Sequence, residues 1–373
     1  MRNLLFVSLV VAAVLTMALS GMAQAAAPVD VTGAGATFPY PLYSRWFYDY
    51  AFVDNAARFN YQSIGSGGGI KQITSKTVDF GGSDAILNDD QKKAAPGLEM
   101  FPTVAGAVVV AYNMVDADGK ALPSGMKLTG DVIADIFLGK ITQWNDDRLT
   151  KLNPDLKIPD KNVVVVHRSD GSGTSFLFTS YLSQVSGEWK SNAGASTSVQ
   201  WPAGVGGKGN EGVAGILTQQ PGSIGYVELA YAVQTKIAYA TVQNQAGKFV
   251  APSLEGTTSA SNAFAAQMPE DMGQLIVNAP GDASYAIAGY TFVLLYADSA
   301  DCAKAQKTAS FLGWAMTPAA DKAATDLLYA PLASGVKAQV VARLGKLTCN
   351  AGKQPVLSAE QIKAITAAIA PAK

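Results

Sequence analysis

The chain has 373 residues, a formal net charge of −1 and a single histidine. A chain of this length is expected to form about two domains, each large enough to bury its own apolar core. The near-neutral charge, without a basic run, argues against nucleic acid as a partner, because phosphate backbones are bound by clustered lysine and arginine.

Residues 1–25 have the layout of a secretory signal peptide. One positive charge, Arg2, precedes an apolar stretch over residues 4–19, and the segment ends in the small-residue sequence AQA, so we expect cleavage after Ala25. No later segment offers the roughly 20 unbroken apolar residues that a membrane span requires. No cysteine follows the cleavage site to carry a lipid. The sequence therefore predicts a periplasmic protein that diffuses freely, as a monomer.

After the leader, extended apolar segments alternate with helical patterns, which is typical of an α/β fold. Strands are predicted at residues 107–112, 163–166 and 291–296. Apolar residues at helical spacing follow three glycine-rich turns and form these stripes: Leu42, Trp46, Phe47 and Tyr50; Ile70 and Ile73; Phe178, Tyr181 and Leu182.

Two segments near the C-terminus differ in their patterns. Residues 253–284 are polar and rich in small residues, so we expect them to be mostly loop. Ser358 and Gln361 form a capping-box pattern, which predicts the start of a final helix over residues 362–369.

Three stretches share one design, a turn rich in glycine and hydroxyl residues that leads into a helical pattern. They are TGAGATFP from Thr32, IGSGGGIKQI from Ile64 and SDGSGTSF from Ser169. The first N–H groups of a helix have no partner within it and carry partial positive charge, so each turn is a candidate cradle for an anion. For any one of them, the alternative is an ordinary tight turn with a capping serine or threonine.

Known nucleotide-binding motifs do not fit these turns. Gly33 and Gly35 are followed by Phe38 where the dinucleotide fingerprint has glycine. The run from Gly171 to Ser175 lacks the lysine and the spacing of a P-loop. Nucleotide binding is therefore disfavoured.

Catalytic and metal chemistry are also poorly supported. His167 lies within six residues of Asp170 and Ser172, on one strand-loop segment, so the three could hardly converge on one reacting atom. A packed or surface histidine is therefore favoured over a catalytic one, and no usable base remains. One histidine, two distant cysteines and no carboxylate cluster also disfavour a metal site. We expect neither an enzyme nor a bound cofactor.

Cys302 and Cys349 are the two cysteines of the chain. In an exported protein they would meet an oxidising environment, which predicts one disulfide between them. Two free thiols are the alternative.

Seven stretches, in order, carry a resemblance to a known family: GAGATFPYPLY, YQSIGSGGGIKQI, VDFGGSDA, LGKITQW, RSDGSGTSFLFTSYL, GVGGKGNEG and GSIGYVE. Together they resemble the periplasmic phosphate-binding proteins of bacterial high-affinity phosphate ABC transporters. The resemblance implies a two-lobed, type II periplasmic binding protein with its ligand in a cleft and two hinge strands. Residues 26–104 and 288–373 would form one lobe, which holds both cysteines, and residues 105–287 the other.

The resemblance also implies the ligand residues. The expected phosphate ligands are Thr37, Phe38, Ser66, Asp84, Arg168, Ser172, Gly173 and Thr174, and Asp170 matches the aspartate that orients the arginine. The sequence departs from the family pattern at three positions. His167 stands where another basic residue is frequent, Gly67 where a second serine is common, and Gly82 where alanine is frequent.

Asp84 argues for phosphate among the oxyanions. An ionised carboxylate repels a dianion unless the ligand offers it a proton, and phosphate does so at neutral pH whereas sulfate does not. The resemblance therefore implies a protein that binds inorganic phosphate and delivers it to a membrane ABC permease. The alternatives are a receptor for sulfate or molybdate and a secreted phosphatase-like enzyme that uses a loop serine.

Overall fold

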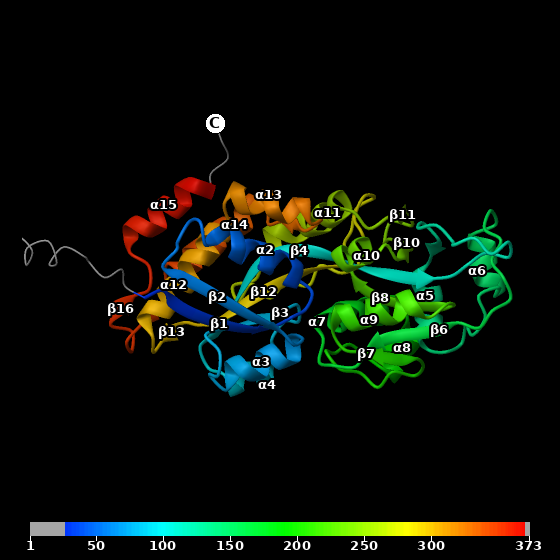
Figure 1. The fold of residues 1–373 in the computed structure, drawn as a ribbon, viewed down its shortest axis with the longest axis horizontal. Coiled ribbons are helices and arrows are strands. Elements are labelled where there is room, and N and C mark those ends of the chain that lie inside the picture. The colour runs from blue at the N-terminus through cyan, green and yellow to red at the C-terminus, as the bar shows by residue number, and fades with distance from the viewer. Residues whose placement is uncertain (1–26, 370–373) are drawn as a thin grey trace, which may run out of the picture.

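The computed structural model describes residues 27–369, so the predicted leader, residues 1–25, lies outside the described residues (Figure 1). The first part of the chain forms β1 (Val29–Gly35), α2 (Tyr40–Tyr50), β2 (Ala57–Ser63), α3 (Ser66–Thr74), β3 (Phe80–Ser83), α4 (Asp89–Ala94) and β4 (Leu98–Asn113).

The middle of the chain forms β5 (Lys127–Leu128), α5 (Gly130–Phe137), α6 (Asp147–Leu152), β6 (Val164–Arg168), α7 (Gly173–Val185), α8 (Gly187–Asn192), β7 (Val205–Gly207), α9 (Gly209–Gln219), β8 (Ser223–Glu228), α10 (Leu229–Thr235), β9 (Ala238–Tyr239), β10 (Thr241–Gln243), β11 (Phe249–Val250), α11 (Leu254–Phe264) and the 3₁₀ helix η1 (Ala265–Gln267).

The last part forms β12 (Ala288–Tyr296), β13 (Asp298–Ser299), α12 (Cys302–Ala315), α13 (Pro318–Asp326), β14 (Ala330–Pro331), α14 (Ser334–Leu344), β15 (Thr348–Cys349), β16 (Gln354–Pro355) and α15 (Ala359–Ile369).

The main strands are hydrogen-bonded in the order β2-β1-β3-β12-β4-β8-β6-β7. β1 pairs in parallel with β2 and β3, and β12 runs antiparallel to β3 and to the first part of β4. From Val108 onwards β4 pairs instead with β8, which in turn pairs in parallel with β6. Parallel strands joined through helices are the architecture of α/β proteins, so the predicted α/β class is confirmed.

The molecule is elongated, with β1, β2, β3 and β12 in one half and β6, β7 and β8 in the other (Figure 1). We call these the first half and the second half. The long strand β4 runs from one half into the other. The chain returns beside it just before β12, where the N–H of Val108 donates to the carbonyl of Ile287 at 2.8 Å.

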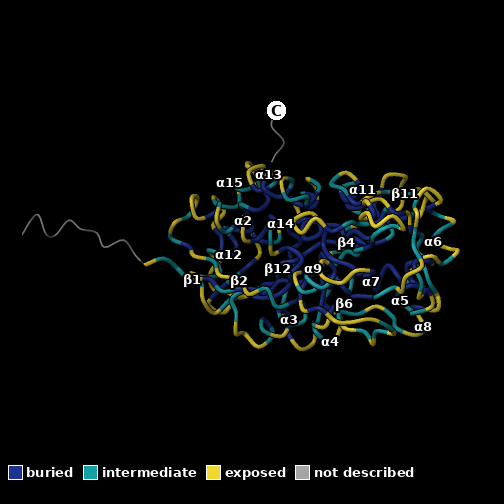
Figure 2. Tube along the Cα trace, turned by 45° about the vertical axis from the view of Figure 1, so that its right-hand side comes forward, coloured by how far each residue is buried: buried dark blue, intermediate teal, exposed yellow. Residues whose placement is uncertain are grey.

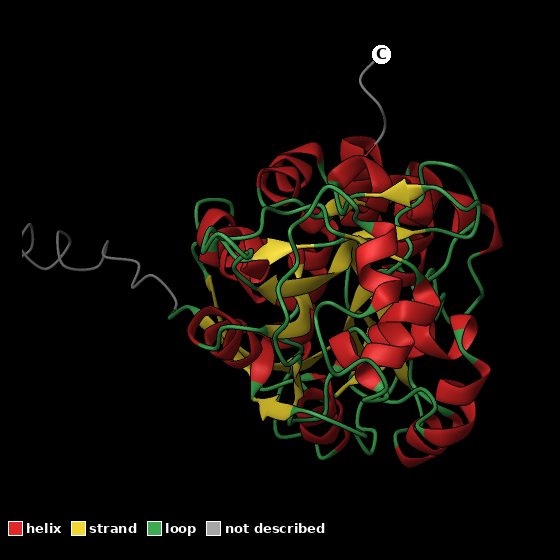
Figure 3. Ribbon diagram, turned by 90° about the vertical axis from the view of Figure 1, so that its right-hand side faces the viewer, coloured by secondary structure: helices red, strands yellow, loops and turns green. Residues whose placement is uncertain are grey.

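Buried residues follow the strands through the interior, and exposed residues lie mainly on the outer loops and helix surfaces (Figure 2). Seen end-on, the strands run through the middle with helices around them (Figure 3). Helix α2 illustrates the pattern, since it buries Leu42, Trp46 and Tyr50 at the predicted spacing. Phe47 is only partly buried and stacks on Phe59, with ring centroids 5.2 Å apart.

The predicted strands fall within or overlap β4, β6 and β12, and the predicted helical stripes fall in α2, α3 and α7. The predicted capping box is present before α15. The Ser358 hydroxyl accepts the N–H of Gln361, and the Gln361 side chain accepts the N–H of Ser358.

The prediction that residues 253–284 are mostly loop is wrong for their first third, because α11 begins at Leu254. Its N-cap, Ser253, accepts the backbone N–H of Gly256 at 3.0 Å. The buried residues of the helix are small, including Thr257 and Ala260, and the helix packs on β4 and β12. A helix whose buried face consists of small residues shows no stripe of large apolar side chains in the sequence. Its stability depends on packing against β4 and β12.

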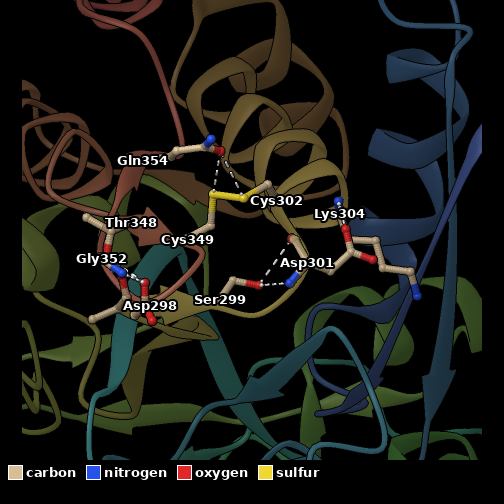
Figure 4. Close-up of a disulfide and its surroundings, with 10 residues drawn as sticks. Asp298, Ser299, Asp301, Cys302, Lys304, Thr348, Cys349, Gly352 and Gln354 are labelled. Atoms are coloured by element: carbon tan, nitrogen blue, oxygen red, sulfur yellow. Dashed lines mark hydrogen bonds between the residues drawn. A yellow bond between two sulfur atoms is a disulfide. The ribbon is translucent and has the colours of Figure 1, made fainter.

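Cys302, at the start of α12, and Cys349, in β15, form a disulfide with Cα atoms 5.3 Å apart (Figure 4). This confirms the predicted bridge and excludes two free thiols. Both cysteines lie in the first half. Within residues 27–369, no helix is both long enough and apolar enough to cross a membrane.

Replacing both Cys302 and Cys349 with alanine is expected to lower the free energy of unfolding by about 4 kcal/mol, because the bridge closes a long loop in the unfolded chain. Urea unfolding of the oxidised wild type and of the double variant measures this difference. Reduced wild type is the control and should match the variant. An oxidised protein no more stable than its reduced form would contradict this role.

Candidate functional site

The carboxyl ends of strands from both halves meet where the halves face each other. The turns after β1, β2 and β3 come from the first half, and the turns after β6, β7 and β8 from the second. In open α/β sheets, ligands bind in the crevice beyond such strand ends. All the ligand positions expected from the sequence are buried here, namely Thr37, Phe38, Ser66, Asp84, Arg168, Ser172, Gly173 and Thr174, and Asp170 is half-buried beside them.

The turn after β1 is held by side chains of both halves, Asn210 and Tyr231 from the second and Tyr329 from the first. The hydroxyl oxygen of Thr37 accepts hydrogen bonds from the backbone N–H and the side-chain amide of Asn210, at 3.1 and 2.8 Å. The carbonyl oxygen of Thr37 accepts from the hydroxyl of Tyr231 at 2.6 Å. The Phe38 carbonyl accepts from the hydroxyl of Tyr329 at 2.7 Å, and the Phe38 ring is fully buried.

Ser66 joins the first half to the start of α7. Its hydroxyl oxygen accepts the backbone N–H of Asp84 and that of Gly173, each at 3.1 Å. A Cβ atom at Gly173 would lie 2.4 Å from the Ser66 hydroxyl and 2.5 Å from a carboxyl oxygen of Asp84. Only glycine therefore fits at this position, because any side chain would separate the two halves.

Asp84 has two carboxyl oxygens with different surroundings. Its Oδ1 accepts a hydrogen bond from the Thr291 hydroxyl at 2.8 Å. Within residues 27–369, its buried Oδ2 has no hydrogen-bond partner. Burial raises the pKa of Asp84 to about 7, and the hydrogen bond from Thr291 and the charge of Arg168 offset only part of that effect. The carboxyl group is therefore poised to take up or release a proton near neutrality.

Arg168 is held by Asp170 in a two-pronged ion pair. The Nε atom donates to Oδ1 at 2.8 Å and one terminal nitrogen donates to Oδ2 at 2.6 Å. The arginine side chain is only 1% exposed. Burial pushes the pKa of Asp170 upward, but the hydrogen bonds and charge of Arg168 outweigh it and hold that pKa below its ordinary value. The other terminal nitrogen of Arg168 faces the Thr174 hydroxyl at 3.4 Å.

Ser172 also lies at the junction of the two halves, but its hydroxyl group caps a helix. It is the N-cap of α7, and its hydroxyl accepts the backbone N–H of Ser175 at 3.0 Å. Its own backbone N–H donates to the carbonyl of Thr197 at 2.8 Å. The alternative that the sequence left open for this turn, a serine that caps a helix, therefore applies to Ser172.

The three departures from the family pattern have local explanations. A Cβ at Gly67 would lie 3.0 Å from the Cα of Gly171, so a serine there would crowd the facing loop. A Cβ at Gly82 would lie 2.1 Å from the hydroxyl of Tyr61, which fills that space. His167 stacks on Trp201 with ring centroids 4.8 Å apart, and its Nδ1 lies 3.0 Å from the Arg168 carbonyl.

Sequence reasoning missed several residues that complete the junction, namely Asn210, Glu228, Tyr231, Thr291 and Tyr329. Asn210 and Glu228 belong to stretches that carried the family resemblance, GVGGKGNEG and GSIGYVE, but no role was drawn from them. The only local sign of Thr291 was a threonine within the otherwise apolar and aromatic strand β12.

Glu228 is a second buried carboxyl group at the junction. Its Oε2 accepts the N–H of Ala230 at 2.9 Å and lies 2.9 Å from the Tyr329 hydroxyl, whose single proton is shared between this oxygen and the Phe38 carbonyl. Burial raises its pKa well above the ordinary value, against the hydrogen bond from Tyr329. Because Tyr329 lies in the first half and Glu228 in the second, this pair also spans the junction.

The arrangement suits an oxyanion. Within residues 27–369, no group of three or more histidine, cysteine, aspartate or glutamate residues is placed to hold a metal. Backbone N–H groups, hydroxyl groups and one guanidinium supply donors, whereas Asp84 supplies a free acceptor. Such a set can satisfy a ligand with several acceptor oxygens and one proton.

Comparison with known proteins gives consistent results. A family model described as the PBP superfamily domain matches residues 22–319. The phosphate-binding protein PstS of Xylella fastidiosa (strain 9a5c) is 47% identical over 317 residues, 84% of each chain. The phosphate-binding protein PstS of Haemophilus influenzae is 45% identical over 325 residues, 87% of this chain and 94% of the relative.

A solved structure supports the fold. The high-affinity periplasmic phosphate-binding protein PfluDING, bound with phosphate, superposes with a TM-score of 0.66 over 84% of this chain and 93% of that chain, at 21% identity. The predicted fold of a type II periplasmic binding protein is thereby confirmed.

Asp84→Asn is expected to gain stability relative to the wild type as pH rises from about 4 to about 8. The folded wild type keeps the Asp84 proton up to a pKa of about 7, whereas the unfolded chain releases it near 3.8. Folding is therefore increasingly disfavoured over this interval, by at most about 4 kcal/mol, and asparagine removes the effect. Urea unfolding in oxyanion-free buffers across this range measures the difference.

The control is Asp90→Asn, whose side chain is 94% exposed in the wild type. Its stability relative to the wild type should not change across the same pH range. If the Asp84→Asn difference were equally flat, the Asp84 carboxyl would titrate normally and the effect of burial would be refuted.

Proposed function

Because this chain belongs to the PstS phosphate-binding proteins of the PBP superfamily, we propose that it binds inorganic phosphate in the periplasm and delivers it to the permease of a membrane ABC transporter. The predicted leader over residues 1–25 supplies the route of export. The bound ligand lies at the junction of the two halves, among the turns that follow β1, β2, β3 and β6.

The buried, unpartnered Oδ2 of Asp84 is the observation that carries this proposal. A buried carboxyl oxygen without a partner destabilises the protein by about 1 to 3 kcal/mol or more, so its presence calls for a ligand that satisfies it. Phosphate at neutral pH carries a proton that this oxygen can accept. Sulfate has none, which favours phosphate over sulfate or molybdate.

The other proposed ligand groups are donors. Arg168 supplies the only guanidinium group among the proposed ligands. Asp170 holds that guanidinium group in a fixed orientation through two hydrogen bonds. Thr37, Ser66, Ser172 and Thr174 contribute hydroxyl groups, and Phe38 contributes its backbone N–H. Gly173 is also a proposed ligand through its backbone N–H, which donates to the Ser66 hydroxyl in this structure.

We propose that the two halves act as lobes that close over the ligand, residues 26–104 with 288–373 forming one lobe and residues 105–287 the other. Contacts across the junction support this division, such as the N–H of Gly67 donating to the carbonyl of Gly171 at 2.9 Å. A ligand held from both sides shifts the population towards the closed form. The closed form is the one a permease would recognise.

We propose binding without turnover. The relatives are named as binding proteins, and two features of this chain argue against a phosphatase. The hydroxyl of Ser172 caps α7, and His167, the only histidine, stacks on Trp201. A serine nucleophile would need a base within hydrogen-bond reach, whereas Nδ1 of His167 lies 3.0 Å from the Arg168 carbonyl.

Arg168→Ala is expected to weaken phosphate binding by roughly 30- to 1000-fold, which corresponds to about 2 to 4 kcal/mol, because it removes a buried charge-assisted donor. Arg168→Lys should recover only part of the affinity, since an ammonium group lacks the fork. Calorimetry with inorganic phosphate on refolded, ligand-stripped protein measures both variants.

Arg58→Ala is the matched control, since Arg58 also pairs with an aspartate, Asp30, but is 65% exposed. It should bind like the wild type. An Arg168→Ala protein with unchanged affinity would remove Arg168 from the site. A parallel incubation with a chromogenic phosphate ester should give no turnover, and turnover abolished by Ser172→Ala would favour the enzyme instead.

Asp84→Asn is expected to gain sulfate affinity by about 10-fold or more while phosphate affinity changes less. The Thr291 hydroxyl donates to Oδ1 and would hold the amide oxygen there, so that the amide N–H₂ takes the place of Oδ2 and becomes a donor to sulfate. Repulsion by the carboxylate is removed at the same time.

The pH dependence of sulfate binding tests the same mechanism. Because the pKa of Asp84 is about 7, the wild-type carboxyl is protonated below that pH, so its weak sulfate affinity should rise as pH falls from 9 to 5. The Asp84→Asn variant should show no such rise. A variant that still ignores sulfate at every pH would refute this account of selectivity and leave phosphate binding itself intact.

A further inference from the structure

Asn210 connects the two halves through a single side chain. It lies in the first turn of α9, in the second half, and is fully buried. Its amide nitrogen donates to the hydroxyl of Thr37 in the first half at 2.8 Å and to the hydroxyl of Thr174 at 3.1 Å. Its backbone N–H also donates to the Thr37 hydroxyl, at 3.1 Å.

The orientation of the Asn210 amide is fixed by a third contact. The backbone N–H of Glu228 lies 2.9 Å from Oδ1 of Asn210 and can only donate. The atom facing it must therefore be the amide oxygen. The two amide hydrogens then face the two threonine hydroxyls, one each.

This orientation decides what the hydroxyls can do. The Thr37 oxygen accepts two N–H groups, which uses both of its lone pairs and leaves only its own proton free. The Thr174 oxygen accepts from Asn210 and, at 3.4 Å, from Arg168. Within residues 27–369 neither hydroxyl donates a hydrogen bond, so both protons are available.

We infer that Asn210 is a positioning residue that makes Thr37 and Thr174 hydrogen-bond donors to the bound oxyanion. A hydroxyl group can otherwise rotate and present either a proton or a lone pair to a ligand. The amide removes the second choice at both positions. The inference rests on the proposed function, since it names a determinant of the same phosphate site that does not itself touch the ligand.

The geometry also couples this effect to closure. Thr37 comes from the first half, whereas Asn210 and Thr174 come from the second. The Thr37 hydroxyl is therefore set as a donor only when the halves meet. Oδ2 of Asp84 then remains an unpaired acceptor among the described residues of the site, as does Oε1 of Glu228 at the same junction, and an ionised Asp84 favours oxyanions with a proton to give.

A double-mutant cycle tests the inference. Asn210→Ala is expected to weaken phosphate binding by about 10- to 100-fold in the wild-type background. There the hydroxyl groups of Thr37 and Thr174 are no longer held as hydrogen-bond donors to the ligand. In a Thr37→Val, Thr174→Val background there is no hydroxyl to orient, so the same change should alter the affinity by less than about threefold. Calorimetry with inorganic phosphate on ligand-stripped protein measures all four chains.

Asn210→Asp provides a second variant that preserves the shape of the side chain and the acceptor for the Glu228 N–H. Its carboxylate accepts from both threonines, so their protons turn away from the ligand and phosphate binding should fall at least as far as in the alanine variant. This variant keeps the inference testable if the alanine variant does not fold.

Asn244→Ala is the matched control, because Asn244 is buried and its amide donates to three carbonyls, those of Gly281, Asp282 and Ser284, away from the site. It should bind phosphate like the wild type even if it is less stable. An equal loss from Asn210→Ala in both backgrounds, or an Asn210→Asp protein that binds like the wild type, would overturn the inference. A wild type that does not bind phosphate would instead refute the proposed function.

Discussion

The buried ion pair between Arg168 and Asp170 is the interaction on which the junction of the two halves depends. A guanidinium group that is 1% exposed would be strongly destabilising without a partner. Asp170 supplies that partner and also accepts the backbone N–H of Gly209 at 3.0 Å. Its carboxyl group lies so close to Gly65 that a Cβ there would be 2.2 Å away. One pair therefore fixes the loop after β6, the start of α9 and a glycine in the facing half.

Around this pair the site is built from neutral donors and few acceptors. Hydroxyl and backbone N–H groups surround the junction, and the charge of Arg168 is already balanced by Asp170. A buried oxyanion can be held by such donors without a large net positive charge, which agrees with the near-neutral chain. The carboxyl groups of Asp84 and Glu228 are the exceptions, and burial raises the pKa of each. Both carboxyl groups therefore reduce the stability of the folded protein once they ionise.

Much of the fold was predictable because its signals are local. Apolar spacing found α2, α3 and α7, and the capping pair found the start of α15. Helix α11 was not predictable in this way, because its buried face consists of small residues such as Thr257 and Ala260. Such a face gives no apolar stripe and becomes stable only against β4 and β12.

The sequence by itself determined which turns carry glycine and hydroxyl groups, where the arginine and the acceptor aspartate stand, and which cysteines pair. The glycine and hydroxyl turns are visible from residue type and short spacing. The cysteine pairing follows from there being two cysteines in a chain expected to be exported, and the expected roles of the arginine and the aspartate are what the family resemblance implies. Tertiary structure alone decided the direction of the hydrogen bonds. Thr37 meets Asn210 across 173 residues and Asp84 meets Thr291 across 207. A hydroxyl group can donate or accept, so its role follows from the partner that folding brings to it, and that partner is not written in the local sequence.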